Sequence, residues 1–115
     1  MDIKTFYSEV NGDYASTLTR LMNERLMNKF VKKFPNDDSY RLLTDALANK
    51  DYETAFRGAH TLKGVSANLG LTQLQSAASE LTEAMRGGKV LEDIALYDAV
   101  KAEYDKTIAL IGQLD

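Results

Sequence analysis

Apolar residues recur at helical spacing along almost the whole chain, in runs separated by a few sharp breaks. Within each run they return every three or four positions, which is the spacing of one face of an α-helix. No segment shows the alternation of a half-buried strand, and no internal repeat or low-complexity stretch is present. The pattern predicts an all-α protein.

Five runs are long enough to form helices of a bundle. They span roughly residues 14–34, 39–50, 52–69, 71–86 and 92–113. A further short helix is expected within the first dozen residues. Because short connections join antiparallel neighbours, we expect an antiparallel up-down four-helix bundle with an additional short N-terminal helix. With 115 residues, the chain forms one helical domain over residues 1–115.

The breaks between the runs carry the residues that end helices. The only proline, Pro35, ends the first run, and Asp51 is suited to cap the third at its N-terminus. Gly70 closes the third run and Gly87–Gly88 close the fourth. The tight connection at Gly70 makes residues 52–86 a helical hairpin. In the first run, the apolar face is predicted to consist of Leu18, Leu21, Met22, Leu26, Phe30 and Phe34.

Composition excludes several classes of function. The chain has no cysteine, so disulfides, zinc–thiolate sites and redox chemistry are excluded. A net charge of −3 gives no global attraction to nucleic acid or to anionic membranes. No apolar run approaches 18 residues, and Asp2, Glu9 and Asp13 interrupt the region where a signal peptide is apolar. We therefore expect a cytoplasmic protein.

One local basic run departs from this acidic balance. It consists of Arg25, Lys29, Lys32 and Lys33. A charge run of this kind is usually a solvated helix face, which is the interpretation that we favour. The alternative is a docking surface for an acidic partner protein.

The only histidine, His60, lies inside the third predicted helix. On a wheel of about 100° per residue it falls at the margin between solvent and the apolar face centred on Ala59. Lys63, Gly64 and Ala67 follow at i+3, i+4 and i+7, so they form one stripe with His60. Glycine in a helix interior costs about 1 kcal/mol relative to alanine. The stripe therefore predicts a shallow clearing where another molecule approaches the backbone.

The residue types in this stripe suit phosphoryl transfer. A lysine beside the histidine favours neutral imidazole, because like charges repel, and neutral imidazole is the nucleophilic form. Once the ring carries a phosphoryl group, the same lysine faces a dianion and stabilises it. Phosphoryl transfer requires little beyond alignment and charge neutralisation. A lone histidine does not build a zinc site, and a hydrolase would need a deep pocket and a second catalytic group.

The segment His60–Gly70, HTLKGVSANLG, resembles the signature of histidine-containing phosphotransfer (HPt) domains, H-x-L-K-G-x-[SA]-x-x-[LIF]-G. The likeness continues more weakly along the whole chain. It implies that His60 is exposed on the bundle and is phosphorylated on Nε2 by the aspartyl phosphate of a response-regulator receiver domain. It also implies that Lys63 contacts the phosphoryl oxygens and that Gly64 leaves room for the receiver. The receiver's carboxylates would supply Mg²⁺, so no cofactor of the chain's own is expected.

The following helix departs from the family pattern at one position. HPt domains often place a glutamine or glutamate there, about three turns along, where it can hydrogen-bond the imidazole Nδ1. The corresponding residue is Thr82, with Ser79 and Glu80 nearby. Because threonine is shorter, we expect its hydroxyl to act through a water molecule.

The resemblance implies a phosphorelay intermediary of two-component signalling. The chain has no Gly-rich phosphate loop and no room for a kinase domain, so we expect a phosphocarrier without autokinase or nucleotide-binding activity. Expected partners are receiver domains and a sensor or hybrid histidine kinase, with no nucleic acid or membrane. The alternative is a helical docking module that binds such domains without carrying phosphate, although modules of that kind typically lack the histidine. The partner-binding residues are predicted to be Arg57, Ala59, Ala67, Leu71 and Gln75.

Two further expectations concern the chain as a whole. A relay that must expose its histidine works as a monomer. The initiating Met1 and the full C-terminal helix favour a free-standing protein over a piece of a larger kinase.

Overall fold

The computed structural model describes residues 1–115 and consists of helices and their connections, without strands. The prediction of an all-α protein is therefore confirmed. Two short 3-10 turns, η1 (Phe34–Asn36) and η2 (Arg86–Gly88), follow α3 and α6. The α-helices are α1 (Ile3–Glu9), α2 (Tyr14–Leu21), α3 (Glu24–Lys33), α4 (Ser39–Ala48), α5 (Tyr52–Asn68), α6 (Thr72–Ala84) and α7 (Ala95–Ile111).

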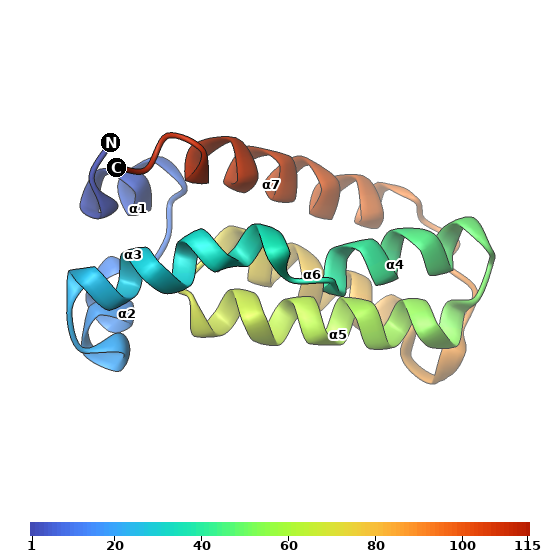
Figure 1. Ribbon diagram of the computed structural model, residues 1–115. Coiled ribbons are helices and arrows are strands. Elements are labelled where there is room, and N and C mark those ends of the chain that lie inside the picture. The colour runs from blue at the N-terminus through green and yellow to red at the C-terminus, as the bar shows by residue number, and fades with distance from the viewer.

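The helices form an elongated antiparallel bundle (Figure 1). Helices α3 and α4 lie nearly end to end, joined by η1, and make one broken rod. Helix α5 returns alongside this rod, α6 reverses direction again, and α7 runs back to the end where both termini lie. The short helices α1 and α2 pack at that same end. The molecule measures 40 × 23 × 20 Å, as expected for a bundle with long parallel axes.

The single helix predicted over residues 14–34 is wrong, because the chain breaks between α2 and α3. Met22 has a φ of 83°, in the left-handed region, which stops α2. Asn23 then caps α3, because its side chain accepts a hydrogen bond from the N–H of Leu26 at 2.8 Å. The break lets α2 turn away from the rod and cover the end of the bundle.

The break also changes which residues of this region form the core. Met22 is 79% exposed and Phe30 is 39% exposed, although both belong to the predicted apolar face. Phe34 is buried as predicted, whereas the buried residues of α3 are Met27 and Val31, which the predicted face did not include. The periodicity was continuous in the sequence, but it belongs to two helices with different orientations.

The other predicted helix ends agree with the structure to within a few residues. Asp51 caps α5 by accepting a hydrogen bond from the N–H of Thr54 at 3.2 Å. Gly70, with a φ of 67°, follows the end of α5. Gly87 and Gly88 have φ values of 75° and 78° and carry the chain out of α6 through η2. Each glycine therefore stands where the backbone needs a left-handed residue.

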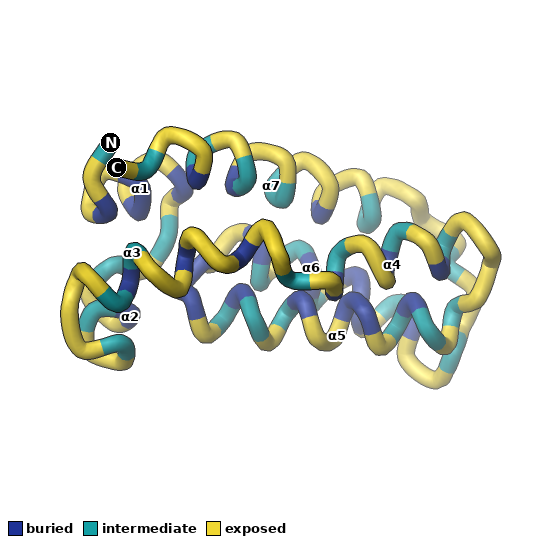
Figure 2. The backbone as a smooth tube through the Cα atoms, in the orientation of Figure 1, coloured by how far each residue is buried: buried dark blue, intermediate teal, exposed yellow.

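Helix α5 is packed tightly on one side only. A Cβ built on Gly58 would lie 2.8 Å from the backbone N of Leu43, so α4 and α5 approach closely at this point. Ala55, Ala59 and Leu62 are fully buried on the same side. Buried segments face one another across the bundle, and exposed segments lie outward (Figure 2). One side of α5 therefore belongs to the core, and the opposite side is left to solvent.

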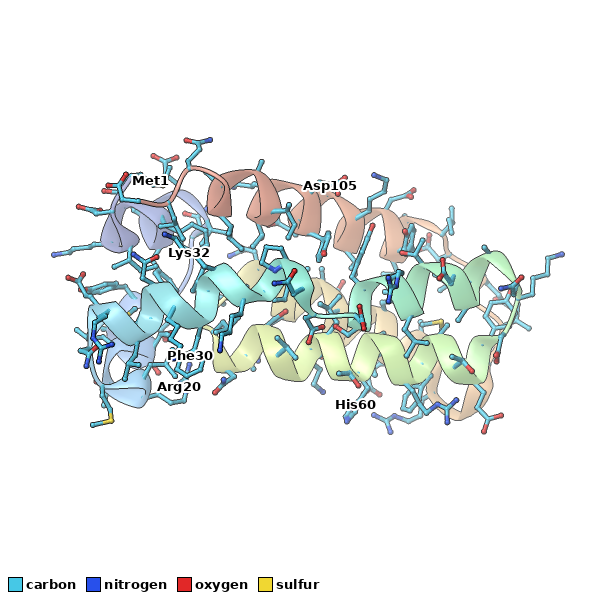
Figure 3. All side chains as sticks on the ribbon, viewed as in Figure 1. Met1, Arg20, Phe30, Lys32, His60 and Asp105 are labelled. Atoms are coloured by element: carbon cyan, nitrogen blue, oxygen red, sulfur yellow. The ribbon has the colours of Figure 1, made fainter.

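The C-terminal end of α5 is held by the first two helices. The guanidinium of Arg20, labelled in Figure 3, donates to the carbonyl of Asn68 at 2.8 and 3.1 Å and to that of Ala67 at 3.1 Å. The buried hydroxyl of Tyr7 donates to the carbonyl of Leu69 at 2.6 Å. These bonds satisfy carbonyl groups that a helix leaves free at its end.

Helix α7 closes the bundle through aromatic contacts with the rod. The rings of Tyr40 and Tyr104 stack with centroids 3.8 Å apart, and Phe34 lies against Tyr104 at 5.8 Å. The hydroxyl of Tyr97 lies within hydrogen-bond distance of the hydroxyls of Tyr40 (3.2 Å) and Thr44 (3.0 Å). These contacts join α4 and η1 to α7.

The basic run of α3 is exposed, in agreement with a solvated helix face. The ammonium of Lys32 donates to the backbone carbonyl oxygen of Asp115 at 2.5 Å, near the N-terminal residue Met1 (Figure 3). The ammonium of Lys33 lies 5.9 Å from the ring centroid of Phe30. Two of the four charges therefore have neighbours within the chain.

Candidate phosphoacceptor site

His60 lies exposed in the middle of α5, and its side chain extends outward from the bundle (Figure 3). The expected exposure of the ring is confirmed. None of the surface hollows of the molecule is lined by His60. The imidazole therefore stands on an outward-facing surface, which another protein can approach and which does not enclose a small substrate.

The ring of Phe56 lies beside the imidazole. The two ring centroids are 6.0 Å apart and the ring planes differ by 13°. Phe56 precedes His60 by four residues, so one helical turn brings the two side chains together. Phe56 is half-buried and packs against the core, whereas His60 is exposed. The stack therefore connects the exposed imidazole to the body of the protein.

An ion pair from the end of α6 lies next to Phe56. The guanidinium carbon of Arg86 is 5.4 Å from the Phe56 ring centroid. Arg86 donates two hydrogen bonds to Glu83, from Nε at 3.0 Å and from Nη2 at 2.7 Å. The hydrogen bond from Arg86 lowers the pKa of Glu83, and the charges of Arg86, Lys63 and His60 lower this pKa further. Glu83 therefore lies within electrostatic reach of both His60 and Lys63.

Lys63 and Gly64 occupy the next turn of α5. Lys63 is half-buried, and no ion pair involves its ammonium. Gly64 is exposed, and a Cβ built on it would have no atom within 4 Å. The stripe predicted from the sequence is thus present as one surface, with a cation and open space beside the imidazole. The structure contains no group of three or more His, Cys, Asp or Glu residues that could hold a metal ion.

Two of the predicted partner-binding residues are not on the surface. Ala59 is fully buried and Leu71 is only 1% exposed, so neither can contact a partner. Ala59 lies at the centre of the apolar face of α5, Leu71 lies in the turn before α6, and both belong to the hydrophobic core. Arg57 is exposed, and Ala67 and Gln75 are half-buried. These three residues remain accessible to a partner.

The prediction that Thr82 orients the ring is also wrong. Thr82 is fully buried, and its hydroxyl donates to the carbonyl of Ala78 one turn earlier in α6, at 2.6 Å. The donor is therefore used inside the bundle, where no surface water reaches it. The residue that follows it, Glu83, is the one that faces outward.

The sequence reasoning missed the cluster formed by Phe56, Glu83 and Arg86. The i−4 spacing of Phe56 from His60 was a signal that could have predicted their contact. Arg86 gave no such signal, because it lies after the end of α6 and reaches Phe56 only through the turn η2.

The site is thus a single exposed imidazole on a helical bundle, with a lysine and an uncovered glycine on the next turn of the same helix. The family model of the Hpt domain matches residues 26–109, from α3 to α7, and the chain belongs to this family. Hpt domains take part in histidine phosphotransfer in phosphorelays, as phosphocarriers that interact with receiver domains and histidine kinases. Comparisons with curated proteins and with solved structures give no match. No helix of the chain has both the length and the apolar character needed to cross a membrane.

Proposed function

We propose that the chain is an intermediary of a phosphorelay in two-component signalling. His60 accepts a phosphoryl group from the aspartyl phosphate of one receiver domain and passes it to an aspartate of another. The observation that carries the proposal is the exposure of His60 on an outward-facing surface of an Hpt-family bundle. A receiver can bring its aspartyl phosphate directly to such a ring.

The transfer step needs only the imidazole and the phosphorylated receiver. The lone pair of Nε2 attacks phosphorus, and the new N–P bond forms as the P–O bond to the aspartyl carboxylate breaks. The carboxylate leaves with the electron pair, and the imidazole then releases its Nδ1 proton. Onward transfer reverses these events with a second carboxylate as the acceptor. Most of the required charge neutralisation comes from the receiver, whose carboxylates hold Mg²⁺.

The residues around His60 have separate roles in this proposal. The ammonium of Lys63, which no ion pair engages, stabilises the phosphoryl oxygens. Gly64 gives the receiver access, and Arg57, Ala67 and Gln75 contact it. The chain acts as a cytoplasmic monomer without a cofactor of its own, and it has no autokinase or nucleotide-binding activity.

A docking module that binds receiver or kinase domains without carrying phosphate is the second candidate. Its support is the same exposed surface, which would bind a partner whether or not His60 reacts. The two candidates differ in whether phosphate reaches the chain.

The test is transfer from a receiver labelled on its aspartate. Wild type is expected to acquire label that is acid-labile and alkali-stable, because a phosphoramidate N–P bond has these properties. His60→Gln is expected to acquire none, because the glutamine amide is not a nucleophile. Circular dichroism of the variant is expected to be unchanged, since His60 is exposed.

Equal labelling of wild type and His60→Gln would reject His60 as the acceptor. Binding of the receiver by both proteins, with no label on either, would favour the docking module.

A further inference from the structure

The His60 imidazole has no hydrogen bond to fix its orientation. None of the side-chain hydrogen bonds of the structure involves either ring nitrogen, and Thr82 is directed into the bundle. An exposed side chain on a helix samples several rotamers unless a neighbour limits it. The ring contact that the structure shows is the near-parallel stack on Phe56. The orientation of the imidazole therefore depends on how firmly Phe56 is held.

Phe56 is held in turn by a cation. The Arg86 guanidinium lies 5.4 Å from its ring centroid, which is within the range of cation–π attraction. A planar guanidinium also stacks on aromatic rings in a way that a lysine ammonium does not. Arg86 therefore limits the movement of the Phe56 side chain.

Arg86 itself is fixed by two features of the fold. Glu83 accepts from two of its nitrogens, which sets both the position and the plane of the guanidinium. The turn η2 that carries Arg86 packs against the first turn of α5, where a Cβ built on Gly88 would lie 3.7 Å from the Cβ of Glu53. The end of α6 is thereby tied to the helix that carries the histidine.

We infer that Arg86, clamped by Glu83, positions the His60 imidazole for phosphoryl transfer by holding Phe56 in place. This inference rests on the proposed function. Arg86 and Phe56 are positioning residues, and neither needs to touch the phosphoryl group. Arg86 of η2, acting through Phe56 of α5, supplies the ring orientation that an amide or carboxylate hydrogen bond from the position of Thr82 in α6 would otherwise supply. Holding a reacting group in its productive orientation is a recognised part of catalysis.

The first arm of the test is NMR and does not depend on phosphate. Because His60 is the only histidine, its imidazole C–H signals are the only ones of their kind in the spectrum. Phe56→Leu is expected to move them downfield, since the ring current of Phe56 is lost, and Arg86→Gln is expected to move them in the same direction by less. Phe56→Tyr keeps an aromatic ring and is expected to preserve their positions. Arg41→Gln is the matched control, because Arg41 forms an exposed ion pair with Asp38, also three residues away, at 2.9 Å, and no hydrogen bond, ion pair or aromatic contact joins Arg41 to Phe56 or His60.

The second arm measures transfer from a phosphorylated receiver. Phe56→Leu and Arg86→Gln are expected to slow transfer to His60 by about tenfold, as a loss of alignment does. Arg86→Lys is expected to remain slow, because the ammonium keeps the charge but not the planar two-bond clamp. Labelling by phosphoramidate, in which the N–P bond to His60 forms as ammonia leaves, is expected to be unchanged in every variant. This small donor can approach the ring from any direction, so it reports nucleophilicity without alignment.

Full rescue by Arg86→Lys would overturn the inference, because it would show that Arg86 acts through its charge on the phosphoryl group. Unchanged imidazole signals in Phe56→Leu would overturn it as well, and so would equal transfer rates for Arg86→Gln and Arg41→Gln. Failure of the proposed function has a different signature, in which wild type accepts no phosphate from any receiver. In that case the NMR arm still decides whether Phe56 and Arg86 orient the ring.

Discussion

The chemistry of this surface depends on very few side chains. His60 is exposed, Lys63 has a free ammonium on the next turn, and Gly64 leaves the space beside them open. A nucleophile, a cation and access are the minimum that a carrier of phosphate needs, because its partner brings the remaining machinery. The absence of a side chain at Gly64 therefore matters as much for the site as the side chains of His60 and Lys63.

Gly64→Gln is expected to slow phosphoryl transfer without destabilising the protein. A Cβ built at this position has no atom within 4 Å, so the substitution is expected to cause no strain where the side chain leaves the backbone. Because glutamine favours helix more than glycine, the free energy of unfolding is expected to rise by about 0.5–1 kcal/mol. Transfer from a phosphorylated receiver is expected to slow sharply, because the glutamine side chain occupies the open space beside His60. Thermal unfolding and transfer rates check the two effects.

Gly64→Ala is the control for this prediction. It gives a similar gain in helix propensity but adds only a methyl group, so transfer is expected to slow much less than with glutamine. Normal transfer by Gly64→Gln would mean that access is not the role of this glycine.

Helix α5 uses its two interior glycines in opposite ways. Gly58 faces α4 and lets the two backbones approach, whereas Gly64, almost two turns later, faces solvent. Both lower the intrinsic stability of the helix, and α5 compensates through its cap at Asp51 and the bonds from Arg20 to its last carbonyls. The element is therefore held at both ends while its middle serves packing on one side and access on the other.

Gly58→Ala is expected to destabilise the protein even though alanine favours helix. The new Cβ would lie 2.8 Å from the backbone N and 3.0 Å from the Cα of Leu43, so α4 must move as a unit. Overpacking of this kind typically costs about 1–3 kcal/mol. Urea unfolding monitored by circular dichroism measures the change. A variant as stable as wild type would show that α4 and α5 can move apart without lowering the free energy of unfolding.

At the scale of the whole molecule, the N-terminal helices close one end of the bundle and hold α5 in place. Tyr7 of α1 is buried and donates to the carbonyl of Leu69, while Arg20 of α2 donates to the preceding carbonyls. Residues 1 and 115 also meet, because the N-terminal ammonium donates to Oδ1 of Asp115 at 3.2 Å and the N–H of Asp115 donates to the carbonyl of Met1 at 2.9 Å. Segments far apart in the sequence therefore fix the position of the helix that presents His60.

This end of the molecule makes stability sensitive to alkaline pH. Burial raises the pKa of Tyr7 from 10.0 to about 12. Between these values the unfolded chain loses the phenol proton while the folded chain keeps it, so the free energy of unfolding falls as pH rises. The loss begins near pH 10 and is complete above about pH 12, where it reaches about 2–3 kcal/mol. Urea unfolding at a series of pH values measures it.

Tyr7→Phe removes this titrating group and is the matched control. The variant is expected to be less stable than wild type at neutral pH, because the carbonyl of Leu69 loses its donor. The difference between the two proteins is expected to shrink between pH 10 and about 12. A constant difference would show that Tyr7 does not cause the alkaline loss. Burial also raises the pKa values of Tyr40 and Tyr104, so some alkaline loss is expected to remain in the variant.

Local patterns in the sequence determined the helices and the surface position of His60. Apolar spacing, the cap at Asp51 and the glycines at helix ends are short-range features, and the stripe of His60, Lys63 and Gly64 lies on a single helix. Only the tertiary structure decided which margins of these helices became core. Leu71, just before α6, and Thr82, near the C-terminal end of α6, are examples, because packing in the folded chain buries both of them.

Two further features also depend on how the helices pack. The break at Met22 is one, because a continuous apolar pattern fits a straight helix as well as two helices that turn over the end of the bundle. The cluster around His60 is the other, because it joins Phe56 of α5 to Glu83 and Arg86 at the end of α6. Contacts between separate elements leave no periodicity in the sequence, so they follow only from the folded arrangement.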